Sequence, residues 1–133
     1  MEEPTRKEVL LYIENAHESL DAAQLNLDHD YYTAAINRAY YAIFYAANAM
    51  LATRELSRSK HSGVISLFRE HFIKTGILSA GLSEIYGQVM NDRHEGDYEL
   101  VSDFSKEDIQ SDIEQAKQFV NEIEIWLDKE GWL

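Results

Sequence analysis

Residues 31–52 read YYTAAINRAYYAIFYAANAMLA, and this stretch decides the fold. Apolar side chains recur on almost every side of the helix that it predicts, which is typical of a helix that other helices cover on several faces. Its many alanines allow neighbouring backbones to approach closely. We therefore expect a central helix from about Tyr31 to Ala52.

Two long helices are predicted at the ends of the chain, over residues 5–27 and 105–129. In each, apolar residues alternate by steps of four and three, so they lie on one face. These residues are Val9, Ile13, Ala16, Leu20, Ala23 and Leu27 in the first helix, and Ile109, Ile113, Ala116, Val120, Ile123 and Leu127 in the second. A single narrow stripe fits one long neighbour, so we expect both helices to lie against the central one.

The helix boundaries carry their own signals. Thr5 and Glu8 have the spacing of a capping box, and Ser105 can cap the last helix with Asp108 in its first turn. Two shorter helices are expected over residues 61–72 and 82–94, and Gly76 and Gly96 follow them as natural stops. The sequence thus predicts an all-α, up-and-down bundle of about five helices, with residues 1–133 as one domain.

Composition limits the classes of function. There is no cysteine, so neither a disulfide nor a thiolate site is expected. The formal net charge is −12, which disfavours broad non-specific binding of nucleic acid. The acidic N-terminus does not resemble a signal peptide, and no apolar run approaches the ~20 residues that span a bilayer. We expect a cytoplasmic protein without membrane association.

The central helix carries one polar line. Steps of three and four place its members on one face: Asn37, Arg38, Tyr41, Tyr45 and Asn48. Arg38 stands among apolar residues, where a charge is costly unless it is paired. Three roles remain open for it: an ion pair inside its own bundle, a contact in a symmetric dimer interface, or binding of an anion such as phosphate.

A basic island offers a second site for an anion. Residues 54–74 hold five bases and two acids, and Lys60 and His61 stand where a helix begins. Backbone N–H groups at a helix N-terminus favour anions, so both side chains are candidate ligand contacts. The alternative is a solvated loop with no ligand.

Metal and cofactor motifs are weak. Glu14 and His17 have the Glu-x-x-His spacing of di-metal bundles, but no second such motif follows. There is no phosphate-binding loop and no glycine-rich dinucleotide fingerprint. We therefore expect neither a metal nor a cofactor.

The central stretch resembles the second helix of HEPN domains, a name that stands for higher eukaryotes and prokaryotes nucleotide-binding. The segments Lys60–Val64 (KHSGV) and Arg93–Tyr98 (RHEGDY) are similar to the small stand-alone bacterial and archaeal members. The resemblance implies a bundle of four to five helices, often a homodimer. It also implies a metal-independent RNA-cleaving cleft built from an Arg and a His four to six residues later. Small members are often paired with a minimal nucleotidyltransferase, in a toxin–antitoxin-like arrangement.

The chain departs from that pattern. Arg38 matches the family's Arg and is the only candidate catalytic residue. Where many relatives have the His, after six intervening residues, this chain has Tyr45. Histidine titrates near neutral pH, whereas tyrosine has an ordinary pKa near 10 and rarely acts as a base. We expect a homodimer in which the polar line of the central helix faces a cleft shared by the two protomers and binds a nucleotide or RNA. A nucleotidyltransferase is the expected protein partner, and the family's nuclease activity is expected to be absent. The alternatives are an endoribonuclease with an altered base, His61 or His94, and a purely structural dimerisation module.

Overall fold

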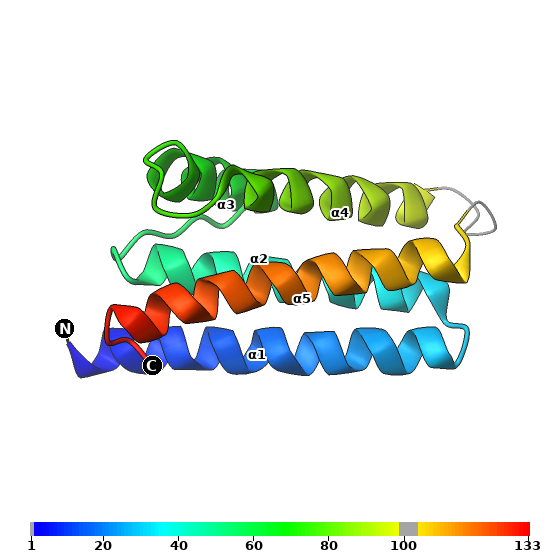
Figure 1. The fold of residues 1–133 in the computed structure, drawn as a ribbon, viewed down its shortest axis with the longest axis horizontal. Coiled ribbons are helices and arrows are strands. Elements are labelled where there is room, and N and C mark those ends of the chain that lie inside the picture. Colours follow the sequence, from blue (N-terminus) through cyan, green and yellow to red (C-terminus); the bar gives the residue numbers. More distant parts are fainter. Residues whose placement is uncertain (1, 99–103) are drawn as a thin grey trace.

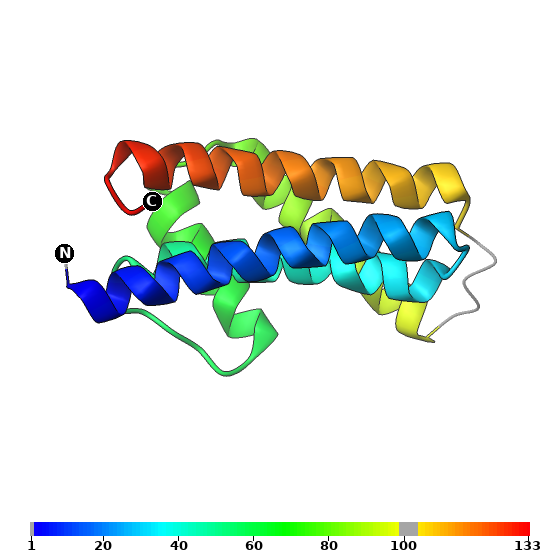
Figure 2. The same ribbon diagram turned by 90° about the horizontal axis from the view of Figure 1, so that it is seen from below.

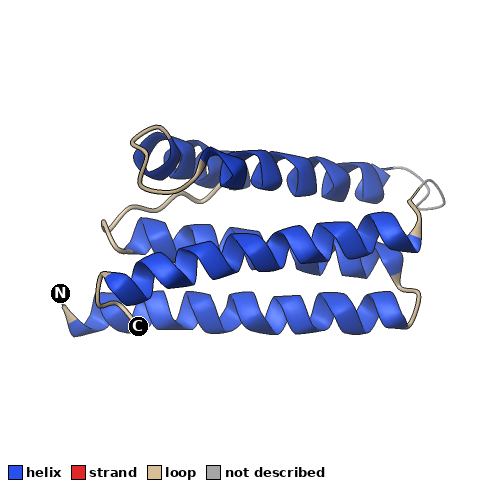
Figure 3. Cartoon of the chain, viewed as in Figure 1, coloured by secondary structure: helices blue, strands red, loops and turns tan. Residues whose placement is uncertain are grey.

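The structure is a computed structural model of the chain and describes residues 2–98 and 104–133. Within these residues it contains helices and no strand (Figure 3). The elements are α1 (Glu3–Asp28), α2 (Tyr32–Ala52), α3 (His61–Phe68), the π-helical turn η1 (Arg69–Ile73), α4 (Ala80–Tyr98) and α5 (Lys106–Lys129). The expected all-α bundle is confirmed.

The helices form three layers (Figure 1). α1 is one outer layer, α2 and α5 lie in the middle, and α3 and α4 form the other outer layer. α1 and α5 lie side by side with α2 behind them (Figure 2), and α3 crosses the long axis of the bundle. Both chain termini lie at the same end.

α2 is the centre of this arrangement. It contacts α1, α3, α4 and α5, and its alanines are almost all fully buried. Small side chains let four neighbours approach one helix, which is the reason that an Ala-rich segment occupies this place. The expectation that α1 and α5 both lie against the central helix is confirmed.

An aromatic cluster joins α3, α4 and α5. The rings of Phe68 and Phe119 lie 5.4 Å apart, and Tyr86 meets Phe119 edge to face at 5.6 Å. Such geometry is favourable for aromatic quadrupoles and adds to the area that the rings bury. It attaches the upper layer to the middle one.

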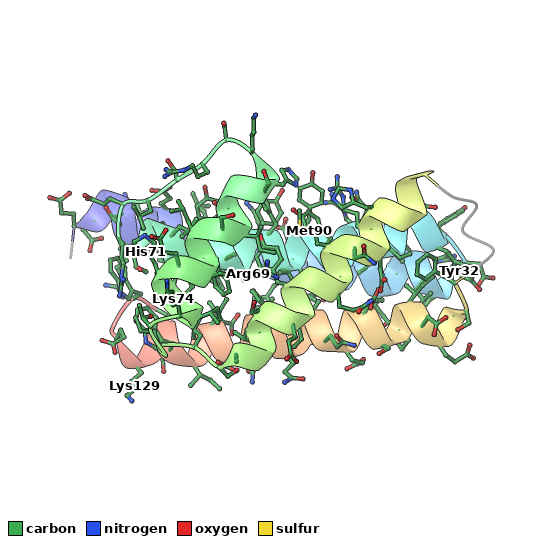
Figure 4. The ribbon with its side chains drawn as sticks, turned by 90° about the horizontal axis from the view of Figure 1, so that it is seen from above. Tyr32, Arg69, His71, Lys74, Met90 and Lys129 are labelled. Atoms are coloured by element: carbon green, nitrogen blue, oxygen red, sulfur yellow. The ribbon has the colours of Figure 1, made fainter. Side chains whose placement is uncertain are left out.

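The helix predicted over residues 61–72 is not one continuous α-helix. The α-helical hydrogen bonding ends at Phe68 and a π-helical turn follows, closed by Lys74 N–H donating to the Arg69 carbonyl at 2.8 Å. Arg69, labelled in Figure 4, donates from Nε to Ser83 Oγ of α4 at 2.8 Å. Gly87 leaves room for this contact, since a Cβ there would lie 3.0 Å from Arg69 Nη2. Gly76 follows with a φ of 77° and ends the segment as predicted.

Two predicted boundaries are wrong. α1 begins at Glu3 and has no side-chain cap, because a proline in its first turn already has the φ of a helix. Thr5 therefore lies inside the helix and forms no capping box with Glu8. α4 runs through Gly96 to Tyr98, since a helix tolerates an internal glycine at a cost of about 1 kcal/mol. The capping box of α5 is confirmed: Asp108 N–H donates to Ser105 Oγ at 3.0 Å, and Ser105 N–H donates to Asp108 Oδ2 at 3.1 Å.

This difference between the two helix starts predicts unequal effects of two similar substitutions. We expect Ser105→Ala to lower the free energy of unfolding by about 1 kcal/mol, because it removes the hydroxyl that caps α5. Thr5→Ala should change it by less than about 0.5 kcal/mol. Urea denaturation followed by circular dichroism measures both. An equal loss in the two variants would contradict the assignment of the caps.

Candidate functional site

The polar face of α2 is covered by α3 and α4 only in part. Figure 4 shows α4 crossing above α2, with α3 on the same side of the bundle. The half-buried ring of Tyr41 and six side chains around it form a group that we name the Tyr41 cluster. Its members are Asn37, Arg38, Tyr40, Tyr41, Phe44, His61 and Arg93.

His61 enters the cluster as the first residue of α3. Its ring stacks on Phe44 at 4.5 Å and meets Tyr41 edge to face at 5.7 Å. The Tyr40 hydroxyl lies 2.7 Å from His61 Nδ1, and Tyr40 itself is fully buried. The imidazole is thus held from below by a core tyrosine and from the side by two half-buried rings.

This contact determines which ring nitrogen of His61 carries a proton. Burial raises the pKa of Tyr40, so its hydroxyl keeps its proton. In the described part of the chain His61 Nδ1 is the one hydrogen-bond partner of that hydroxyl, so donation by Tyr40 satisfies both groups. Burial, Arg93 and His94 lower the pKa of His61, in that order. His61 is therefore a neutral imidazole with its proton on Nε2, and this N–H can donate to a ligand.

Arg93 brings a positive charge from α4. Its guanidinium carbon lies 4.7 Å from the centre of the Tyr40 ring and 5.5 Å from that of Tyr41, and its Nε donates to Asn37 Oδ1 at 3.1 Å. The aromatic faces and the amide oxygen hold the planar group in one orientation. Arg93 is therefore positioned before any ligand arrives.

Arg38 approaches Tyr41 as well, with its guanidinium carbon 4.8 Å from the ring centre. Beside it a cavity of about 220 Å³ opens between α1 and α2, lined also by Glu18 and Tyr45. Over the residues that the structure describes, no salt bridge joins Arg38 to an acid. An ion pair inside its own bundle, one of the three roles left open by the sequence, is thus not formed there.

The other predicted site residues lie in different surroundings. Tyr45 is half-buried and its ring lies 5.8 Å from that of Tyr41, at the edge of the cluster. Asn48 is only 7% exposed and donates to the Phe44 carbonyl, so the structure does not bring its side chain to the cluster. Lys60 is exposed and precedes α3 as its N-cap residue, next to His61.

Sequence reasoning missed three members of the cluster. Tyr40 and Phe44 read as core residues of α2, and Arg93 read as part of the end of α4. Arg93 and His61 both belong to the segments that carried the family resemblance, which was the available signal. The contact between Tyr40 and His61 spans 21 positions and has no local signature.

The chemistry of the cluster is that of an anion site. Two guanidinium groups and one imidazole N–H converge on aromatic rings, and a guanidinium fork suits the oxygens of phosphate. No group of three or more ligating side chains able to hold a metal ion occurs among the described residues. His17, considered above for a metal, instead bonds to Glu124. No helix in the described ranges is long and apolar enough to cross a membrane.

The comparisons with known proteins identify the family of the chain. The model of the HEPN domain matches residues 9–126. A UPF0332 protein of Thermotoga maritima is 39% identical over 109 residues, which cover 82% of this chain and 83% of its own. Two proteins of Methanocaldococcus jannaschii carry the name "Putative toxin": one is 33% identical over 96% of this chain and 86% of its own, the other 38% identical over 89% and 87%.

The protonation of His61 can be measured directly. We expect its imidazole to titrate below the ordinary histidine pKa of 6.5, with the proton of the neutral form on Nε2, in ¹H–¹⁵N NMR spectra. Arg93→Gln should raise the pKa of His61, because it removes a positive charge that disfavours the imidazolium. Lys117→Gln, the matched loss of a charge on α5, should not. A neutral form protonated on Nδ1 would contradict donation by Tyr40.

Proposed function

The chain belongs to the HEPN domain family, and from this premise we propose that it is a toxin-type member that binds RNA or a nucleotide through a phosphate group at the Tyr41 cluster. The toxin-type assignment draws on the relatives in Methanocaldococcus jannaschii that carry that name. Arg38, Tyr41 and His61 are the proposed ligand-binding residues, with Arg93 added from the structure.

One observation carries the proposal: three groups able to donate to an anion meet around a single tyrosine ring. Arg38 lies 4.8 Å from its centre, Arg93 5.5 Å, and the His61 ring 5.7 Å. In a chain with a net charge of −12, two guanidinium groups and an imidazole N–H beside one ring form a local surface that favours an anion. A phosphate group accepts from several donors at once, which suits this arrangement.

The aromatic surface supports a nucleotide rather than free phosphate. Tyr41 and Phe44 are half-buried, so each ring packs on the protein and keeps part of its surface in solvent. Bases stack on such rings, and each stacked base contributes about 1–3 kcal/mol without selecting a sequence. The ring of Tyr45 lies next to that of Tyr41, one helical turn further along α2, and enlarges this aromatic surface. A phosphate held by the arginines and a base on the rings is the binding mode that we propose.

We propose further that the chain does not cleave RNA. The family's histidine is replaced by Tyr45, whose phenol is a poor base at neutral pH. His61 lies in the cluster but accepts from Tyr40 at Nδ1, so its outward nitrogen carries a proton and lacks a lone pair for general base catalysis. Tyr45 and His61 are thus both unsuited to the task in the free protein.

A homodimer and a protein partner complete the proposal. Arg38 lies at the α1–α2 edge of the cluster without an acid bound to it in the described residues, and a second copy of the chain across this face would bring two such clusters together. Family resemblance suggests a nucleotidyltransferase as the further partner of a toxin-type chain. Tyr45 remains a proposed member of the shared face, whereas Asn48 is buried and bonds to the Phe44 carbonyl of its own helix.

Binding is tested with a short fluorescent RNA that ends in a phosphate, followed by anisotropy. We expect Arg38→Ala to weaken binding at least about tenfold, because each hydrogen bond to a charged group contributes about 1.5–3 kcal/mol. Arg38→Lys should restore part of the affinity, since the charge returns without the fork. The control Lys117→Ala removes one exposed charge from α5. Equal weakening by Arg38→Ala and the control would contradict a specific site.

Cleavage is tested with the same RNA, unlabelled, and purified wild-type protein. We expect wild type to be inert and Tyr45→His to gain cleavage, because imidazole supplies the missing base beside Arg38. Combining Tyr45→His with Arg38→Ala should abolish that gain. Cleavage by wild type that is lost in Arg38→Ala or His61→Ala would overturn the proposal and establish a ribonuclease with an altered base.

A further inference from the structure

A second cavity lies between α4 and α5, away from the Tyr41 cluster. It has a volume of about 680 Å³ and is open to solvent along one side. Four acids line it: Glu84 and Asp92 from α4, and Asp108 and Asp112 from α5. None of the described residues that line it is basic. We name this cavity the α4–α5 groove.

Asp112 is the unusual member of the groove. It is only 4% exposed, although aspartate is almost never buried unless it is paired. Its Oδ2 is buried and accepts no hydrogen bond from an N–H group or a hydroxyl of the described residues. Burial raises the pKa of Asp112 to about 8, and the hydrogen bond to Asp92 and the negative charges of Asp92 and Asp108 add to this effect.

Asp92 and Asp112 line the same groove, and a raised pKa of this kind is the behaviour of a carboxyl–carboxylate pair that shares one proton. Two carboxylates side by side repel each other, so near neutral pH Asp112 keeps its proton and bonds to Asp92. Oδ2 of Asp112 has no N–H or hydroxyl donor among the described residues, and an unsatisfied buried oxygen costs free energy. A cation with several N–H donors would remove both penalties, since it could displace the shared proton and donate to the oxygens that remain.

Size and chemistry distinguish among cations. In the described residues no three ligating side chains approach one another as a metal ion requires, which disfavours a magnesium or calcium site. A cavity of about 680 Å³ is far larger than one ion. Ile85 and Phe104 line it beside the acids, and their apolar surfaces suit methylene groups. The set therefore fits ammonium groups joined by an aliphatic chain.

We propose that the α4–α5 groove binds an aliphatic polyamine, with one ammonium group between Asp92 and Asp112 and the methylene chain along Ile85 and Phe104. Glu84 and Asp108 accept from the remaining ammonium groups. On binding, the proton shared by Asp92 and Asp112 leaves to solvent, both carboxylates carry their charge, and the ammonium group compensates them. The site is independent of the Tyr41 cluster and of the function proposed there.

The probe is spermidine, measured by isothermal titration calorimetry at constant ionic strength in two buffers with different enthalpies of ionisation. We expect saturable binding that releases close to one proton at neutral pH, and an affinity that rises between about pH 6 and about pH 8.5. Asp112→Asn should weaken binding at least about tenfold and abolish the proton release. Asp128→Asn, which removes an exposed acid near the end of α5, should leave both unchanged.

Three outcomes would overturn the proposal. The first is equal binding by wild type and Asp112→Asn. The second is the same heat and proton release with magnesium chloride as with spermidine, which would indicate a general response to cations. The third is saturation without proton release. Asparagine can keep the hydrogen bond to Asp92, so the variant is expected to fold; if circular dichroism shows otherwise, Asp92→Asn replaces it, and its binding of spermidine at wild-type affinity would equally overturn the proposal.

Discussion

The central position of α2, which is buried along most of its surface, is the constraint on which the rest of the structure depends. A helix that four others contact must have small side chains where they cross it, and its large side chains must fit the gaps. Tyr40 is one of these, and its hydroxyl has to find a partner inside the protein. The Tyr40 hydroxyl bonds to Nδ1 of His61, so the packing of the core also orients the first residue of α3. The site on the surface is held by the same contacts that close the bundle.

Basic and acidic side chains gather on different sides of α4. An acidic chain with net charge −12 collects Arg38, Arg93 and His61 at one ring, while the opposite flank of α4 collects four acids. Arg93 and Asp92 are neighbours in sequence, but they point to different sides of one helix and belong to different sites. α4 therefore separates a surface suited to anions from a groove suited to cations. The two proposed sites can be tested separately because no residue is shared between them.

Much of the fold could be predicted because it depends on periodicity, which is a local property. The stripes of α1 and α5 and the largely apolar surface of α2 predicted their places correctly, and Ser105 with Asp108 marked the start of α5. The predictions failed where another residue or another helix overrode a local sequence signal. Thr5 did not cap because a preceding proline starts the helix, Gly96 did not stop α4, and the π-helical turn at Arg69 accompanies a contact with Ser83 of another helix.

The sequence by itself determined that the chain is an all-α bundle of this family. It also determined that Asn37, Arg38 and Tyr41 share one face, because residues three and four apart on a helix are neighbours whatever surrounds them. Only the tertiary structure decided that His61 and Arg93 join that face, that Asn48 turns to its own helix, and that Asp112 meets Asp92. These contacts join helices that are distant in the chain. Their geometry depends on how the helices pack and cross, and on the burial that follows, which no short window of sequence contains.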